Sequence, residues 1–236
     1  MLSVDFHCHT HFSRCGVHSL IEVLTEAKRL GMQGLAITDH GSALNSTTPP
    51  TYFDRLFDPV PGIRMIKGIE CNIIDNKGVI DLPAYVIKYL DIILLGIHPN
   101  VPANPDQNYN TEMLLTALQK NRAVDIITHP NDNAYLVDFN LIAKYAAQNG
   151  MAIELNNSKT ALQRIDDTTT RALVAACKKA QCRIAVNSDA HGLQEIGQDS
   201  AVLPFLAEVN YPKELIVNHS ADSAFAFVAE RKQFKC

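Results

Sequence analysis

The chain has 236 residues, a formal net charge of −4 and a hydrophobic fraction of 47%, with 19% of its residues charged. This composition is typical of a globular protein with a large core, and it excludes a disordered chain. The acidic balance and the lack of a long basic run argue against nucleic acid or an anionic membrane as a partner. We expect residues 1–236 to form a single domain.

The N-terminal segment MLSVDFHCHT has no basic start and no sustained apolar run, so we expect no signal peptide. No apolar run approaches the roughly 20 residues that a membrane span needs. The six cysteines are scattered and form no CxxC pair. We therefore expect reduced thiols and a cytoplasmic protein.

Short apolar runs alternate with helical stretches along the whole chain. A capping box of Ser19 and Glu22 predicts the first helix, over IEVLTEAKRL, and Gly31 can close it. In chain order, strands are expected at residues 2–6, 34–38, 64–74, 91–97, 124–128, 152–156 and 183–188. Later helices are expected at residues 111–120, 138–148, 166–180 and 220–232, and residues 215–217 are a weak candidate for an eighth strand.

Several of these strands, such as DIILLGI, are almost continuously apolar, which is typical of parallel strands buried on both faces. Repeated strand–helix units predict an α/β fold, either a closed barrel or an open doubly wound sheet. Two longer loops, residues 41–51 and 99–110, both follow strands. They should lie at the same end of the sheet, where they could act as lids.

Histidines gather where the predicted strands end, and carboxylates accompany them. Each alone has an ordinary explanation, such as a hydrogen-bonded turn histidine or a capping aspartate. Together they favour a site for divalent ions, because the carboxyl ends of parallel barrel strands meet on one face. The residues concerned are His7, His9, His40, His98, His129 and His191, with Asp5, Asp39, Glu70 and Asp189.

The motifs HCHT, TDH, GIE and SDAH, with His98 and His129 between the last two, resemble those of the polymerase and histidinol phosphatase (PHP) family, most closely its YcdX-like single-domain phosphatases. The resemblance spans nearly the whole chain. It implies a distorted (β/α)7 TIM-like barrel that holds three divalent ions, usually zinc. It implies that His7, His9, Glu70 and Asp189 hold one ion, that Glu70 bridges to a second held by His98 and His129, and that His40 and His191 help to hold a third.

The chain departs from the YcdX-like pattern at one position, where a histidine ligand of the third ion is replaced by Cys15. A thiolate binds zinc well, so Cys15 could preserve the site. An ordinary thiol at this position, with His18 or His11 supplying the missing nitrogen, is the alternative. Manganese and iron also suit the histidine and carboxylate ligands.

The predicted reaction is hydrolysis of a small phosphate monoester by a metal-bound hydroxide in a dinuclear or trinuclear site. Glu70, Asp189 and His191 are the predicted catalytic residues; the last two serve first as ligands and could also assist proton transfer. For the substrate phosphate we predict contacts from Arg14, Lys159 and Arg164, although each could be a solvated surface cation.

Two other functions compete with a phosphatase. A metal-dependent amidohydrolase also begins with H-x-H, but Glu70 stands where a bridging carboxylate would serve a phosphoesterase. The second is a PHP module that binds metal without catalysis. A nuclease is disfavoured by the acidic balance. The sequence does not indicate the substrate or the oligomeric state.

Overall fold

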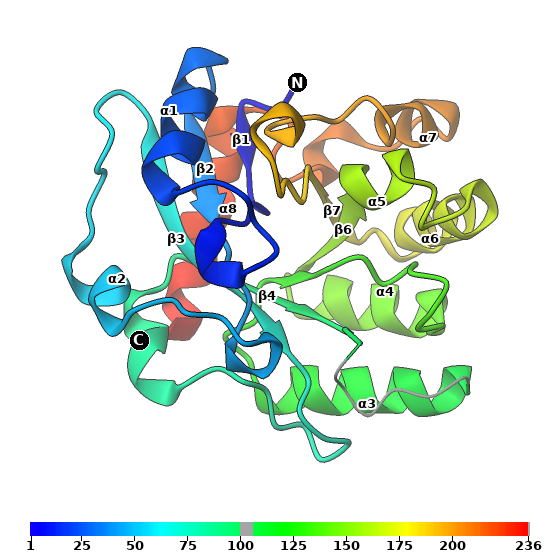
Figure 1. Ribbon diagram of the computed structural model, residues 1–236. Coiled ribbons are helices and arrows are strands. Elements are labelled where there is room, and N and C mark those ends of the chain that lie inside the picture. The colour runs from blue at the N-terminus through cyan, green and yellow to red at the C-terminus, as the bar shows by residue number, and fades with distance from the viewer. Residues whose placement is uncertain (100–105, 236) are drawn as a thin grey trace.

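The computed structural model describes residues 1–99 and 106–235. Seven strands lie side by side in one sheet, in the order of the chain, and each neighbouring pair is parallel (Figure 1). All carboxyl ends therefore face one rim, which we call the carboxyl rim. The strands are β1 (Val4–Asp5), β2 (Gly34–Ile37), β3 (Arg64–Asn72), β4 (Ile92–Gly96), β5 (Ile126–Ile127), β6 (Ala152–Asn156) and β7 (Arg183–Asn187).

The sheet nearly closes into a barrel between β1 and β7. Beyond the strand ends, Cys8 forms an isolated bridge with Ala190. Lower down, the Asn218 amide donates to the carbonyls of Val4 and Val186 and so links the two strands. The weak eighth strand is not formed, because residue 216 makes only an isolated bridge with β7. The prediction of a distorted seven-stranded barrel is confirmed.

Helices cover the outside of the barrel and follow the expected capping signals closely. The capping box at Ser19 is present, and Asp138, Asp166 and Ser220 each cap the helix expected after them. The helices are α1 (Leu20–Arg29), α2 (Pro50–Arg55), α3 (Gln107–Lys120), α4 (Phe139–Gln148), α5 (Asn157–Ala161), α6 (Asp167–Ala180), α7 (Leu203–Glu208) and α8 (Ala221–Lys232).

The differences from prediction lie in the connections. Helix α3 begins four residues earlier than expected, because Asp106 accepts hydrogen bonds from the first backbone amides of the helix. The short helices α2, α5 and α7 were not predicted. The loop expected at 41–51 contains a turn of 3-10 helix, Ser42–Leu44, and leads into α2 at Pro50. In the loop expected at 99–110, residues 100–105 lie outside the described part of the chain.

The core explains why only one end of the barrel is open. Apolar residues inside the barrel, among them Phe6 and Leu94, form one cluster with Phe227 and Val228 of α8, which closes the amino-terminal end. There a buried ion network ties α8 to the start of β5: Asp125 accepts from Arg231 at 2.9 Å and pairs with Lys235 at 2.7 Å. The carboxyl rim is left for polar side chains. None of the described helices combines the length and hydrophobicity needed to cross a lipid bilayer.

Candidate metal centre

Four side-chain donor atoms converge at the carboxyl rim. We call His7, His9, Glu70 and Asp189 the inner group. The two imidazole Nε2 atoms lie 3.0 Å apart. Glu70 Oε2 is 3.3 Å and 3.4 Å from them, and Asp189 Oδ1 is 3.3 Å and 3.2 Å from them. All four side chains are almost completely buried.

These spacings fit a metal ion. A tetrahedral ion with bonds of about 2.0–2.1 Å separates its ligand atoms by roughly 3.3–3.4 Å. The imidazole–imidazole and imidazole–carboxylate spacings of 3.0–3.4 Å are close to this value, and the donor atoms of His7, His9 and Asp189 all lie within 4.8 Å of one another. Glu70 Oε2 is buried and has no hydrogen-bond donor in good geometry among the described residues, although His40 Nδ1 lies 2.8 Å from it and the Nε2 atoms of His7 and His9 lie nearby. Such an arrangement favours a shared cation over direct hydrogen bonds.

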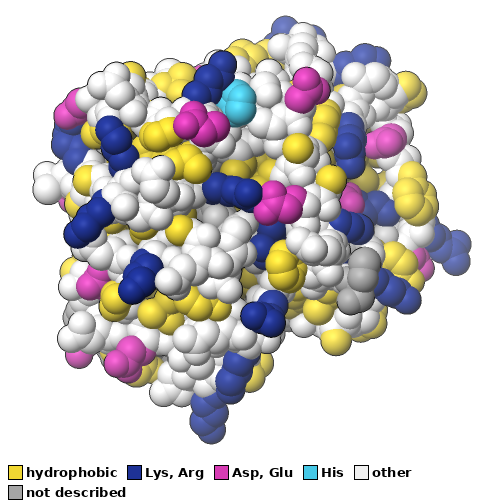
Figure 2. All heavy atoms as spheres, turned by 180° about the vertical axis from the view of Figure 1, so that it is seen from behind, with side chains coloured by type: hydrophobic (Ala, Val, Ile, Leu, Met, Phe, Trp, Pro, Cys, Tyr) yellow, Lys and Arg dark blue, Asp and Glu magenta, His cyan; other side chains and the backbone are white. Residues whose placement is uncertain are grey.

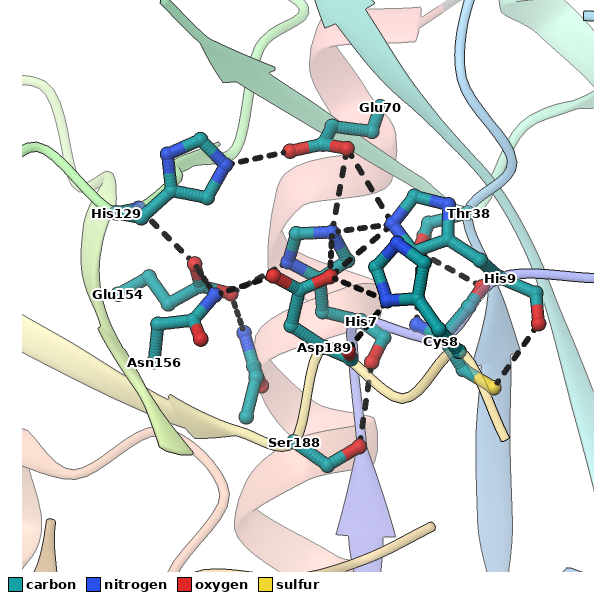
Figure 3. A network of polar contacts seen from close by, with 12 residues as sticks. His7, Cys8, His9, Thr38, Glu70, His129, Glu154, Asn156, Ser188 and Asp189 are labelled. Atoms are coloured by element: carbon teal, nitrogen blue, oxygen red, sulfur yellow. Dashed lines mark hydrogen bonds and ion pairs between the residues drawn. The ribbon is translucent and has the colours of Figure 1, made fainter. Parts of the chain in front are cut away.

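Glu70 also faces a second set of donors, which we call the middle group, Glu70, His98 and His129. Glu70 Oε1 lies 3.1 Å from His98 Nε2 and 3.0 Å from His129 Nε2. One carboxylate therefore presents its two oxygens to two separate sets of imidazoles, as Figure 3 shows for His129 on one side and His7 and His9 on the other. This is the arrangement of a bridging ligand.

A third set, the open group, consists of Cys15, His40 and His191. Their donor atoms, together with one from His9, all lie within 4.8 Å of one another. Of the three residues considered for the missing ligand, the structure brings Cys15 to this cluster. His18 and His11 are not part of it, and the His11 ring packs against Phe12.

The hydrogen-bond partners of three histidines assign their tautomers. His7 Nδ1 lies 2.7 Å from the carboxylate of Glu154, and His191 Nδ1 lies 2.9 Å from the carbonyl oxygen of Asp189. Both partners only accept, so each Nδ1 carries the proton and donates it. In the neutral imidazole each Nε2 then keeps its lone pair, which is the form that binds metal.

His9 reaches the same tautomer through a relay. Ser13 Oγ donates to Asp39 Oδ1 at 2.6 Å, so it must accept from His9 Nδ1, 3.0 Å away. His9 Nε2, which faces His7 and Asp189, is left with its lone pair. Asp39 also accepts from the amides of Thr10 and Ser13 and thereby folds the loop after β1 over the site. Asp39 is thus an organiser of this loop.

Glu154 and Ser13 were missed by the sequence analysis. Glu154 lies in the middle of β6, where it accepts from His7, from the His129 amide at 2.9 Å and from Asn187 at 2.8 Å. A lone carboxylate inside the apolar run MAIELN was the available signal, because a charge is buried only where it is paired. Ser13 carried no comparable signal.

Backbone geometry and small residues also shape the site. His129 and Asp189 have φ angles of 31° and 54°, a region that non-glycine residues rarely occupy and that costs about 1–3 kcal/mol. A Cβ at Gly96 would lie 2.9 Å from the His98 ring and 3.0 Å from the His129 ring. A Cβ at Gly16 would lie 2.3 Å from the Thr10 carbonyl oxygen, so glycine there lets the loop bring Cys15 back to the rim.

The charges of the cluster are strongly coupled. Burial opposes ionisation of Glu70, but His7, His98 and His40 hold the pKa of its carboxyl well below the usual range. Burial and the neighbouring His40 lower the pKa of His9 to about 3, so its imidazole is neutral. Burial opposes ionisation of Cys15 as well, but hydrogen bonds to His191 and His40 lower its pKa to about 7. The ionised carboxylate, the neutral imidazole and the acidic thiol are suitable ligand forms. Against the opposing effect of burial, Glu70 raises the pKa of His40 to about 10, and Cys15 and Asp189 raise the pKa of His191 to about 9, so a metal ion would have to displace a proton from each of these rings.

A cavity of about 1000 Å³ opens above the three groups. The three cations predicted for substrate contact, Arg14, Lys159 and Arg164, all line it. Lys159 Nζ pairs with Asp132 Oδ2 at 2.5 Å, whereas neither arginine pairs with a carboxylate among the described residues. The predicted cations therefore face the same space as the clustered donors.

Comparisons with known proteins agree with this geometry. The PHP domain model matches residues 5–158. The chain belongs to the PHP domain family. It is 34% identical over 237 aligned residues to a probable phosphatase of Caldanaerobacter subterraneus subsp. tengcongensis, with 98% of this chain and 93% of that one covered. It is 33% identical to a probable phosphatase of Edwardsiella ictaluri, with 98% and 96% covered.

Solved structures share the fold of this PHP chain at low sequence identity. Histidinol phosphate phosphatase from Lactococcus lactis, in complex with zinc, L-histidinol and phosphate, matches with a TM-score of 0.63 and 14% identity over 97% of this chain and 93% of that one. A chain from archaeal ribonuclease P with mature tRNA matches with a TM-score of 0.61 and 18% identity, covering 98% and 91%. Because proteins with such different roles share it, the fold alone does not assign the function.

Proposed function

We propose that this PHP chain is a metal-dependent phosphoesterase that hydrolyses a small phosphate monoester, and that its 236 residues work as one domain. In this proposal the inner group holds one divalent ion, the middle group a second and the open group a third. Zinc suits the mixture of imidazole, carboxylate and thiolate ligands best. Manganese and iron are the alternatives that metal analysis would detect.

The observation that carries the proposal is the position of Glu70. Its two oxygens face two donor groups, with His7 and His9 on one side and His98 and His129 on the other. Two adjacent divalent ions are the usual means of hydrolysing phosphate esters, because together they lower the pKa of water and neutralise charge on the phosphoryl oxygens. The names of the curated relatives, which match over nearly their full length, support the same reaction.

Side chains around the donor cluster orient a ligand, exchange protons and bind phosphate. Asn156 Nδ2 donates to Asp189 Oδ2 at 2.8 Å and so turns Oδ1 toward the inner group. About a third of the His191 side chain is exposed, so this residue can exchange protons with the cavity while it serves as a ligand. Arg14, Lys159 and Arg164 line the cavity and can bind phosphate oxygens through charged hydrogen bonds.

Neither the face drawn in Figure 2 nor the net charge gives support for a nucleic-acid substrate. On the face in Figure 2, basic and acidic side chains are interspersed, and the described residues visible there form no continuous basic band. The formal net charge of −4 agrees. We therefore propose a small phosphorylated molecule as the substrate.

Metal analysis by mass spectrometry on the purified protein, together with release of inorganic phosphate from p-nitrophenyl phosphate, tests the proposal. We expect bound divalent metal and turnover that a chelator abolishes and added zinc or manganese restores. Hydrolysis of amide substrates, assayed in parallel, tests the alternative that the protein is an amidohydrolase. Turnover of amides alone, or bound metal with no turnover of any phosphate monoester in a broad panel, would contradict the proposed reaction.

A further inference from the structure

Cys15 differs from the other described cysteines in its surroundings. Cys8, Cys71, Cys177 and Cys182 are buried, whereas Cys15 is exposed and lines the cavity above the metal-binding groups. Its sulfur lies within 4.8 Å of a ring nitrogen of His40 and of His191. Cys15 is therefore both a member of a donor cluster and accessible to small molecules in the cavity.

The open group depends strongly on Cys15, because His9 serves the inner group. His9 is close to this group, but Ser13 occupies its Nδ1, and its Nε2 lies 3.0 Å from the His7 nitrogen of the inner group. One lone pair cannot hold two ions, so His9 belongs to the inner group. Of the four clustered donors among the described residues, Cys15, His40 and His191 then remain for the third ion, and the thiolate is the one anion among these three.

We propose that Cys15 is an oxidation site, at which hydrogen peroxide converts the thiolate to a sulfenic acid and thereby releases the ion held with His40 and His191. This inference rests on the metal cluster of the proposed function. In the reaction the sulfur attacks one peroxide oxygen, the O–O bond breaks, and the displaced hydroxide takes up a proton to become water. The sulfur is oxidised by two electrons and the peroxide is reduced.

The oxidation should release one ion selectively. Oxidation of Cys15 leaves the open group with two imidazoles and no anionic ligand, and both imidazoles are on partly exposed residues. The inner group keeps four ligands that are almost completely buried, and Glu70 continues to serve the middle group. A thiol reductant such as dithiothreitol reduces the sulfenic acid to the thiol and is oxidised to its disulfide, after which the ion can bind again.

The experiment uses the zinc-loaded wild type, Cys15→His and Cys177→Ala, treated with hydrogen peroxide in the presence of a chromogenic zinc chelator. Cys15→His replaces the thiolate with a ligand that peroxide does not oxidise under these conditions. Cys177→Ala removes a buried thiol of α6 and is the matched control. Dimedone labelling followed by peptide mass spectrometry identifies the sulfenic acid.

For the wild type and Cys177→Ala we expect release of about one zinc ion per chain and dimedone on Cys15. In a second sample without dimedone we expect recovery of the zinc after the chelator is removed and dithiothreitol and zinc are added. For Cys15→His we expect no release above the untreated sample. Equal release from Cys15→His, release without labelling of Cys15, or labelling of Cys15 without release would each overturn the inference. Metal content and phosphate release before peroxide treatment report separately on the proposed function.

Discussion

The inner and open groups lie side by side at the carboxyl rim but are built differently. The inner group stands at strand ends, and its histidines are held by buried acceptors, Glu154 for His7 and Ser13 for His9. The open group stands on loops; Cys15 is exposed, and a third of the His191 side chain is accessible. The comparison teaches that the barrel preorganises one part of the site and leaves another part open to exchange and to changes of ligand.

The largest effect is expected where two groups share a residue. Glu70→Gln keeps the size of the side chain but removes the charge that faces both the inner and the middle group. Loss of a residue that only hydrogen-bonds to a metal ligand typically lowers activity or metal affinity by roughly 10–100-fold. Because Glu70 is itself a proposed ligand of two ions, we expect a larger loss. Phosphate release and metal content measure it, with circular dichroism as the check of folding. Retention of both full activity and full metal content would contradict the bridging role.

The second effect tests the buried support of the inner group. Glu154→Gln weakens the acceptor of His7 Nδ1, so we expect a loss of roughly 10–100-fold in zinc affinity or turnover. The same change at Glu195 is the matched control, because that carboxylate accepts from the backbone amides of His191 and Gly192 beside the open group. Chelator competition measures the affinities. A larger loss in Glu195→Gln than in Glu154→Gln would reverse the comparison between the two groups.

The third effect distinguishes the groups by the number of ions. Cys15→Ala removes the thiolate of the open group, so the protein should bind about one zinc ion fewer per chain and keep the ions of the inner and middle groups. Mass spectrometry under native conditions counts the ions directly. An unchanged count would show that Cys15 is not a ligand, and loss of all metal would show that the groups are not independent.

The fourth effect concerns the cations that line the cavity. Arg164→Met removes a guanidinium that has no carboxylate partner among the described residues, and we expect KM for p-nitrophenyl phosphate to rise by about 10-fold, equivalent to about 1.4 kcal/mol. Lys159→Met should cost less, because Asp132 already pairs with Lys159 and the substrate must compete with that carboxylate. Steady-state kinetics separate KM from kcat. A fall in kcat at constant KM would argue against a role in binding phosphate.

The smallest effect on activity is expected at the opposite end of the barrel. Arg231→Met removes one of the two cations that pair with buried Asp125. Breaking a buried pair typically lowers the free energy of unfolding by about 3–5 kcal/mol, while kcat/KM should stay unchanged below the unfolding transition. Chemical denaturation and steady-state kinetics measure the two quantities. A large change in kcat/KM would mean that the closed end is coupled to the carboxyl rim.

The sequence was sufficient to predict the strands, the longer helices and most members of the donor cluster. Apolar runs and capping residues such as Asp138 and Asp166 indicate strands and helices through interactions between neighbouring residues. Because parallel strands end on one face, the histidines and carboxylates at their ends were expected to meet. The short helices α2, α5 and α7 lacked such local signals and were missed.

By itself, the sequence determined the repeated strand–helix units and the types of donor atom at the strand ends, because apolar runs and strand ends are read locally, while the closed barrel was implied by the family resemblance. Only the tertiary structure decided that Cys15, not His11 or His18, joins His40 and His191. It also revealed the contact of Glu154 with His7, across 147 positions of the chain. Both depend on closure of the barrel and on the loop that Asp39 organises, and such long-range contacts leave no periodic pattern in the sequence.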